Sequence, residues 1–282
     1  MSAPGYFAIA CELAKTLGED TFMFYTGAPQ NSVRADIAKM RIEEGKKILD
    51  AVGISTSSLV IHAPYIVNPA SKRKEENFLF AISFLKQELA RAHAFGVQNI
   101  VVHPGSHLGD GEDYALDCLV EAIDAILEGD ETDVTICLET MAGKGKEVGT
   151  NFDFYASLFP RLARQERVGL CLDTCHLNDA GYDLTHFDEV LSELDFKIGL
   201  GKVKVVHLND SKFECGSHKD RHENIGYGTI GFDILSKIYR NPNLKGVPFV
   251  LETPWIGDVM PYQQEIQMLR SGIYQPNWRD LL

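Results

Sequence analysis

Short runs of consecutive hydrophobic residues recur along the chain, separated by longer segments in which hydrophobic side chains return every three or four positions. Strands that face solvent on one side alternate hydrophobic and polar residues. These runs are nearly continuous instead, as is typical of parallel strands covered on both faces. The predicted strands are the segments 21–26, 59–65, 99–105, 135–140, 168–174, 203–210 and 248–255.

The segments between these runs are predicted to be helices. In 71–96 the hydrophobic residues form one stripe with helical spacing, Ser71 can cap the start, and Gly96 stands where helices commonly end. Segments 114–128 and 188–194 show a similar pattern. Strands recur at intervals of roughly 40 residues, which predicts one α/β domain over residues 1–282, a (β/α)8 TIM barrel.

A complete barrel of this type has eight strands, but only seven are predicted. The chain begins with a loop and a helix over residues 4–18, so either the barrel closes differently or, as we expect, the first strand is missing or truncated at the N-terminus. The barrel would then have an unpaired edge.

Polar residues with metal-binding side chains stand at the ends of six predicted strands. They are His62, His103, Glu139, Asp173 (with His176 three residues later), His207 and Glu252. Barrel enzymes build their sites from the carboxyl ends of strands, so these side chains are expected to meet at one end of the barrel. Asp220 and His222 are candidates to join them, because positions two apart in an extended segment point the same way.

Imidazole and carboxylate ligands together suit zinc, manganese or iron. One such residue alone is more often a hydrogen-bonded or solvated side chain than a ligand. Five of the nine histidines occupy these positions, however, so the set as a whole predicts a metal centre.

Two glycine-rich segments are weaker candidates. Segment 226–231 matches G-x-G-x-x-G, but no predicted strand precedes it, so we expect a turn into a helix that begins near Phe232. Segment 143–149 resembles a phosphate-binding loop only loosely. Its Lys144 and Lys146 belong either to a mobile loop or to a phosphate contact.

Composition restricts the class of protein further. Of the 282 residues, 45% are hydrophobic and 24% charged, as in ordinary globular enzymes, which excludes a disordered chain. No hydrophobic run approaches the ~20 residues of a membrane span, and residues 1–20 show no secretory signal. Six cysteines scattered through hydrophobic segments predict reduced thiols, so we expect a cytoplasmic protein with no membrane partner.

The formal net charge of −13 argues against a protein that adheres to nucleic acid through a broad basic surface. Bound cations can reverse the field within a site, so this charge does not exclude a nucleic-acid enzyme.

Several sequence strings resemble the endonuclease IV family of apurinic/apyrimidinic (AP) DNA-repair endonucleases. They are HAPY, VVHPGSH, LETMAGKG, CLDTCH with DAGYD, VHLNDSK, KDRHENIG and VLETP. The resemblance runs in unbroken order from about Thr21 to Leu269, which is nearly the whole chain.

The resemblance implies a zinc-dependent hydrolase of base excision repair with three zinc ions per chain. Such an enzyme cleaves the DNA phosphodiester 5′ to an abasic site and leaves a 3′-hydroxyl and a 5′-deoxyribose phosphate. The first zinc would be held by His62, His103 and Glu139, the second by Glu139, Asp173, His207 and Glu252, and the third by His176, Asp220 and His222. Glu139 or Glu252 would orient the attacking water or accept its proton.

The same resemblance implies that the partner is double-stranded DNA with an abasic site, bound by a monomer. Tyr65, Ile66 and Asn68 would lie in a loop that enters the minor groove. Gln30 is a weaker candidate for DNA contact, because it is equally compatible with an ordinary polar turn.

Two alternatives are also compatible with the sequence. A xylose-isomerase-like sugar isomerase or epimerase on the same barrel needs one divalent ion, for which Glu139, Asp173, His207 and Glu252 would suffice. The second alternative is a protein that binds damaged DNA without cleaving it, or that uses zinc only as a scaffold. The number of metal ions per chain distinguishes the isomerase from the endonuclease. A test of DNA cleavage distinguishes the endonuclease from a protein that only binds DNA or uses zinc as a scaffold.

Overall fold

In the described part of the chain, seven parallel strands form the centre of the fold, each paired with the next in the order β1-β2-β3-β4-β5-β6-β9. The computed structural model describes residues 6–282 of the chain. The strands are β1 (Met23–Phe24), β2 (Val60–His62), β3 (Asn99–Val102), β4 (Thr135–Glu139), β5 (Val168–Asp173), β6 (Val203–His207) and β9 (Phe249–Val250). Each lies inside a predicted segment and pairs in parallel, so the predicted strands are confirmed.

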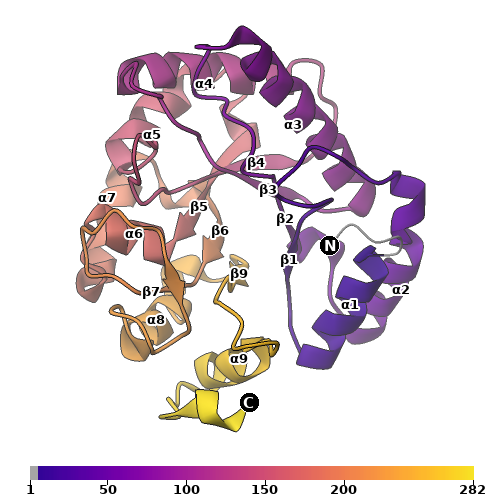
Figure 1. Cartoon of the computed structure of the whole chain (residues 1–282), viewed down its shortest axis with the longest axis vertical. Coiled ribbons are helices and arrows are strands. Elements are labelled where there is room, and N and C mark those ends of the chain that lie inside the picture. The colour runs from indigo at the N-terminus through magenta and orange to yellow at the C-terminus, as the bar shows by residue number, and fades with distance from the viewer. Residues whose placement is uncertain (1–5) are drawn as a thin grey trace.

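Helices cover the outer face of this curved sheet (Figure 1). They are α1 (Tyr6–Leu17), α2 (Ile42–Val52), α3 (Glu75–Phe95), α4 (Glu112–Leu127), α5 (Phe152–Leu158), α6 (Thr174–Ala180), α7 (Phe187–Lys197), α8 (Phe232–Tyr239) and α9 (Tyr262–Ser271). The expected cap of α3 is wrong, because Ser71 Oγ accepts a hydrogen bond from the Arg73 N–H in a preceding turn. The helix ends as predicted at Gly96, whose φ of 81° is left-handed.

Hydrophobic side chains form two layers. The inner layer has one residue from each of six neighbouring strands, namely Val60, Val101, Cys137, Cys171, Val205 and Val250. The larger outer layer lies between the strands and the helices. It includes Phe7, Phe24 and Phe95, whose ring centroids lie 4.9–5.3 Å apart. Because successive side chains of a strand point to opposite faces, these layers fix which strand-end residues face the inside of the barrel.

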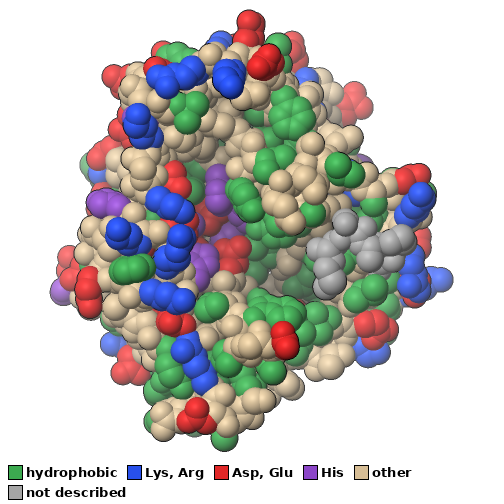
Figure 2. All heavy atoms as spheres, viewed as in Figure 1, with side chains coloured by type: hydrophobic (Ala, Val, Ile, Leu, Met, Phe, Trp, Pro, Cys, Tyr) green, Lys and Arg blue, Asp and Glu red, His purple; other side chains and the backbone are tan. Residues whose placement is uncertain are grey.

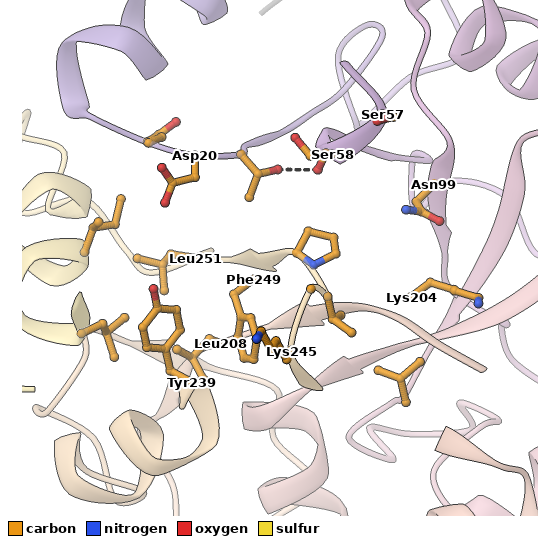
Figure 3. Close-up of a pocket in the computed structure, with 18 of the residues that line it drawn as sticks. Asp20, Ser57, Ser58, Asn99, Lys204, Leu208, Tyr239, Lys245, Phe249 and Leu251 are labelled. Carbon is orange, nitrogen blue, oxygen red and sulfur yellow. Dashed lines mark hydrogen bonds between the residues drawn. The ribbon is translucent and has the colours of Figure 1, made fainter. Parts of the chain in front are cut away.

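β1 and β9 are the edges of the sheet, and no strand pairing joins them within residues 6–282. The barrel is therefore nearly closed, with an open side between these two strands (Figure 1). Cavities of about 690 Å³ and 310 Å³ lie along this open side. In Figure 3, Asp20 and Ser58 border the larger cavity on one side, and Phe249 and Leu251 border it on the other.

The TIM-barrel fold class predicted from the sequence is thus confirmed. The expectation of a missing first strand concerns the chain before α1, and residues 1–5 lie outside the described part. Among residues 6–282, no helix has both the length and the apolar character needed to cross a membrane.

A second, two-stranded sheet corrects one predicted boundary. β7 (Asp210–Ser211) pairs antiparallel with β8 (His222–Glu223). The predicted strand 203–210 is therefore divided, because β6 ends at His207 and Asp210 belongs to this second sheet.

Candidate metal centre

Each of the six polar residues at the strand ends follows a residue of the inner hydrophobic layer by two positions. In chain order the pairs are Val60 and His62, Val101 and His103, Cys137 and Glu139, Cys171 and Asp173, Val205 and His207, and Val250 and Glu252. Residues two positions apart in a strand face the same side. The hydrophobic layer thus directs all six polar side chains to the inside of the barrel at its carboxyl end.

The nine candidate ligands form three groups, and within each group the ligand atoms lie within 4.8 Å of one another. The groups are His62, His103 and Glu139; Glu139, Asp173, His207 and Glu252; and His176, Asp220 and His222. Glu139 belongs to two groups: its Oε2 lies 3.0 Å from His62 Nε2, and its Oε1 lies 3.1 Å from His207 Nδ1. These are the groupings that the family resemblance implies.

His176 reaches the third group because α6 begins directly at the end of β5. Asp173 Oδ1 accepts a hydrogen bond from the His176 backbone N–H at 2.8 Å and so caps the helix. The imidazole of His176 then lies with its Nε2 3.1 Å from Asp220 Oδ1.

The expected reason for Asp220 and His222 to converge is wrong, although both residues do lie in one group. Asp220 has a φ of 54°, so its backbone is left-handed rather than extended. His222 belongs to β8, whose position is set by its pairing with β7. The two side chains are therefore brought together by the shape of the loop and not by the two-residue period of a strand.

Backbone carbonyl groups orient three of the candidate histidines. Nδ1 of His62, His176 and His222 lies 2.6, 2.9 and 3.3 Å, respectively, from a carbonyl oxygen. A carbonyl oxygen only accepts hydrogen bonds, so Nδ1 carries the proton in each neutral ring and the lone pair is left on Nε2. This is the arrangement of a metal-binding imidazole that is held by a second hydrogen bond.

Charges inside the groups balance one another. Burial disfavours the charged form of Glu139, but the charges of His207 and His103 outweigh burial and hold the pKa of Glu139 well below its usual range. Burial acts to lower the pKa of His176, but Asp173 and the hydrogen bond to Asp220 raise this pKa well above the usual value. The acidic side chains around His176 therefore favour positive charge at this position.

The donor atoms of these groups fit divalent metal ions. Within the described residues, Nε2 of His222 is buried without a hydrogen-bond partner, which is costly unless a bound cation accepts its lone pair. Three or four nitrogen and carboxylate donors per group match the ligands of catalytic zinc. Cys175 also lies near Asp173 and His222, but burial raises the pKa of its thiol and makes it a poor ligand.

Tyr25 is a residue of the site that the sequence did not single out. It follows Met23, which packs against the inner hydrophobic layer, by two positions, and thus has the same place on β1 as the ligands have on other strands. Its ring centroid lies 5.3 Å from that of His62. Its position in segment 21–26 matches that of the ligands in the other strands, but tyrosine is not a usual ligand of zinc, so the residue type gives no sign of a metal site.

Asn209 is a second residue that the sequence did not single out. It forms hydrogen bonds to two ligands of the second group. Its Nδ2 donates to Asp173 Oδ2 at 2.7 Å, and its Oδ1 accepts from the Glu252 backbone N–H at 2.7 Å. These partners are 36 and 43 residues away in the chain, so spacing in the sequence gives no sign of them. Asn209 fixes one candidate ligand by its carboxylate and another by its backbone.

The four residues predicted to contact DNA differ in the exposure of their side chains and in their hydrogen bonds within the protein. Tyr65 and Ile66 expose 57% and 36% of their surface. Asn68 donates from Nδ2 to the Ser106 carbonyl oxygen at 2.9 Å and accepts at Oδ1 from the Ser106 N–H at 3.0 Å. Gln30 is an exposed turn residue. Tyr65 and Ile66 are therefore available to a partner, whereas Asn68 holds their loop in place.

The G-x-G-x-x-G segment is filled by a side chain of the protein itself. The Asp210 carboxylate accepts hydrogen bonds of 3.0–3.2 Å from the backbone N–H groups of Gly226, Gly228, Ile230 and Gly231. These are the groups that would otherwise bind a phosphate. α8 begins at Phe232, so the predicted turn into a helix is confirmed.

Glu265 of α9 is a buried carboxylate that joins three parts of the chain. It accepts hydrogen bonds from Asn224, Ile225 and Thr253. Burial raises the pKa of Glu265 to about 7, although these hydrogen bonds oppose the shift. Glu265 therefore ties α9 to the segments that follow His222 and Glu252.

Replacement of Glu265 by glutamine is expected to change how stability depends on pH. Because the pKa of about 7 exceeds the ordinary value of 4.5, the folded state holds a proton between these values that the unfolded state has lost. The unsubstituted chain should therefore lose stability relative to E265Q as the pH rises through this window. Urea unfolding at several pH values between 5 and 8 measures the difference, and a difference that stays constant would contradict the assignment.

Comparisons with known proteins agree with the fold. Residues 11–272 match the family model described as xylose isomerase-like TIM barrel, which defines the class of protein. "Probable endonuclease 4" of Pediococcus pentosaceus is 48% identical over 278 residues, covering 96% of this chain and 93% of that protein. The protein of the same name from Staphylococcus carnosus is 44% identical over 279 residues, covering 97% and 93%.

Solved structures also include a member of the endonuclease IV family among the matches. Endonuclease IV from Thermus thermophilus matches with a TM-score of 0.80 at 31% identity, covering 94% of this chain and 93% of that one. Structures of sugar epimerases and epimerase-like proteins match at 19% identity or less and show the fold alone. The chain belongs to the endonuclease IV family. It is an enzyme of the hydrolase class, as the resemblance implied.

Proposed function

We propose that the chain is a zinc-dependent AP endonuclease of base excision repair. It hydrolyses the DNA phosphodiester 5′ to an abasic site and leaves a 3′-hydroxyl and a 5′-deoxyribose phosphate. The observation that carries the proposal is the presence of three ligand groups at one end of the barrel, two of which share Glu139. The names of the relatives, endonuclease 4 and endonuclease IV, support the same activity.

Each of the three groups would hold one zinc ion. When bound, the ions supply an activated water and neutralise charge on the phosphate and the leaving oxygen. Glu139 and Glu252 are the proposed catalytic residues. Burial disfavours the charged form of both carboxylates, but His207 outweighs it and lowers their pKa values. Carboxylates with low pKa values are weak bases, so we assign them mainly to orienting the attacking water.

Basic side chains border the third group. Figure 2 shows histidine and acidic side chains inside a hollow on one face of the molecule, with lysine and arginine side chains along one rim. The exposed cations in the two loops beside this group are Lys144, Lys146, Lys212, Lys219 and Arg221. An acidic protein thus concentrates positive charge where a DNA phosphate would approach, which favours the phosphate contact for Lys144 and Lys146.

The proposed DNA contacts lie in the loop after β2. Tyr65 and Ile66 are exposed apolar side chains of the kind that insert between base steps in the minor groove. Asn68 keeps this loop against Ser106, and Gln30 adds a polar contact from the loop after β1. Extrusion of the nucleotide costs least at an abasic site, where base pairing is already lost.

The proposed partner is double-stranded DNA with an abasic site, bound by one copy of the chain in the cytoplasm. All six cysteines are free and five are buried. Free thiols agree with a reducing compartment.

The test of this function is cleavage of a duplex with one abasic-site analogue by the zinc-loaded chain. Cleavage is expected at one position, 5′ to the analogue, with a 3′ end that a polymerase can extend. An undamaged duplex of the same sequence is the control. Binding without cleavage would support a protein that only recognises damage, and it would overturn the proposal.

The sugar isomerase alternative uses only the group of Glu139, Asp173, His207 and Glu252. The other two groups, which contain four more histidines and Asp220, would then have no role. Three zinc ions per chain are expected by elemental analysis, whereas the isomerase requires one.

A further inference from the structure

Asp179 is a buried carboxylate that the proposed mechanism does not use. It lies in the last turn of α6, with no exposed surface. Its Oδ1 accepts hydrogen bonds from Ser211 Oγ at 2.7 Å and Asn178 Nδ2 at 3.1 Å, and its Oδ2 accepts from the Asp220 backbone N–H at 2.8 Å. A buried carboxylate is costly unless such donors satisfy it, so its presence requires an explanation.

The hydrogen bonds of Asp179 hold a loop in an unusual backbone conformation. His218 and Asp220 both have left-handed backbones, with φ of 55° and 54°, which residues with a side chain adopt at a cost. The His218 N–H donates to the Asp179 carbonyl oxygen at 3.0 Å, and the Gly216 N–H donates to that of Asn178 at 2.9 Å. The end of α6 therefore accepts hydrogen bonds from three backbone N–H groups of the loop, those of Gly216, His218 and Asp220.

Asp179 is connected to every member of the third ligand group. His176 lies three residues earlier on α6, so the two side chains share one face of the helix. Asp220 is held directly through its N–H. Ser211, which donates to Asp179, lies in β7 opposite His222 of β8.

We propose that Asp179 is a positioning residue that shapes the His176–Asp220–His222 group for its metal ion. The inference rests on the proposed function, because it assumes an ion in the third group. α6 holds Asp220 twice: Asp179 fixes its backbone, and His176 Nε2 lies 3.1 Å from its Oδ1. Outer residues of this kind commonly change metal affinity by about 10- to 100-fold.

Asp179→Asn is the test, because asparagine has nearly the same shape. It carries one acceptor oxygen and one N–H2 group, so it cannot accept from both Asp220 and Asn178. The affinity for the zinc ion of the His176–Asp220–His222 group is expected to fall about 10- to 100-fold, while the other two ions per chain are retained. Competition with a chromogenic chelator, with zinc counted by elemental analysis, measures this without any assay of activity.

Two controls separate positioning from general destabilisation. Asp130→Asn removes a charge from the Asp130–Arg167 ion pair, which lies away from the ligand groups, and is expected to leave the affinity for all three ions unchanged. Combining D179N with Asp220→Ala should lower zinc affinity by less than the sum of the two single losses, because Asp179 acts in part through Asp220. Should D179N not fold, Ser211→Ala removes one hydrogen bond to the same carboxylate and should weaken the same ion to a smaller degree.

The outcomes distinguish this inference from the proposed function. If the unsubstituted chain holds three ions and D179N holds them with equal affinity, the role of Asp179 is overturned alone. If the unsubstituted chain never holds a third ion, the proposed function fails and the inference fails with it.

Discussion

Replacement of Glu139 by alanine is expected to reduce DNA cleavage by roughly a thousandfold or more, which corresponds to about 4 kcal/mol of transition-state stabilisation. The Glu139 carboxylate lies within 3.1 Å of His62, His103 and His207 and belongs to two of the three ligand groups. No other ligand is shared in this way by the groups assigned to the first and second ions. Its removal should disrupt both sites at once.

Single-turnover cleavage of the abasic duplex, together with the zinc content of the purified variant, measures this effect. Glu121→Gln is a matched control, because Glu121 forms an exposed ion pair with Lys72 on the outside of the barrel. That variant should cleave at the unsubstituted rate. An E139A variant that retains activity within tenfold would show that Glu139 is not a shared ligand.

Removal of the metal ions is expected to abolish cleavage and to lower the melting temperature. An ion present at about 1,000 times its Kd stabilises the folded state by about 4 kcal/mol, which for a chain of this size corresponds to roughly 7 °C per ion. Dialysis against a chelator followed by calorimetry measures the loss, and added zinc should restore both activity and melting temperature. Full activity after complete removal of metal would refute the role of the ions.

Metal retention should also depend on pH, with a sign that follows from the site. His176 and His207 have pKa values raised well above the usual value of 6.5, because nearby acidic groups outweigh their burial. These histidines must lose their protons to bind an ion, so protons compete with zinc as the pH falls. In the same chelation experiment, release of zinc should become easier from pH 8 to pH 6.

The strand-end residues could be predicted from the sequence because a parallel barrel obeys two local rules. Hydrophobic runs mark the strands, and the period of two places residues such as His62 and Glu139 on the inside, beyond Val60 and Cys137. These rules require no knowledge of distant contacts, and the family resemblance supplied the groupings.

The remaining features depend on contacts between segments far apart in the chain. Asn209 and Asp179 act through partners 32 to 43 residues away, and no local pattern marks such pairs. Asp220 joins its group through a left-handed backbone, which the assumption of an extended segment could not foresee. The start of α3 was missed because Ser71 forms a local turn in competition with capping.

The open side of the barrel makes the ligand groups unequal in their resistance to local unfolding. β4, which carries Glu139, has a neighbouring strand on each side, whereas β9, just before Glu252, pairs with β6 alone among residues 6–282. Fraying of β9 breaks one row of hydrogen bonds, but separating β4 breaks two, so opening is cheaper at the sheet edge. Of these two ligands, Glu252 is therefore expected to detach before Glu139 when the protein fluctuates locally.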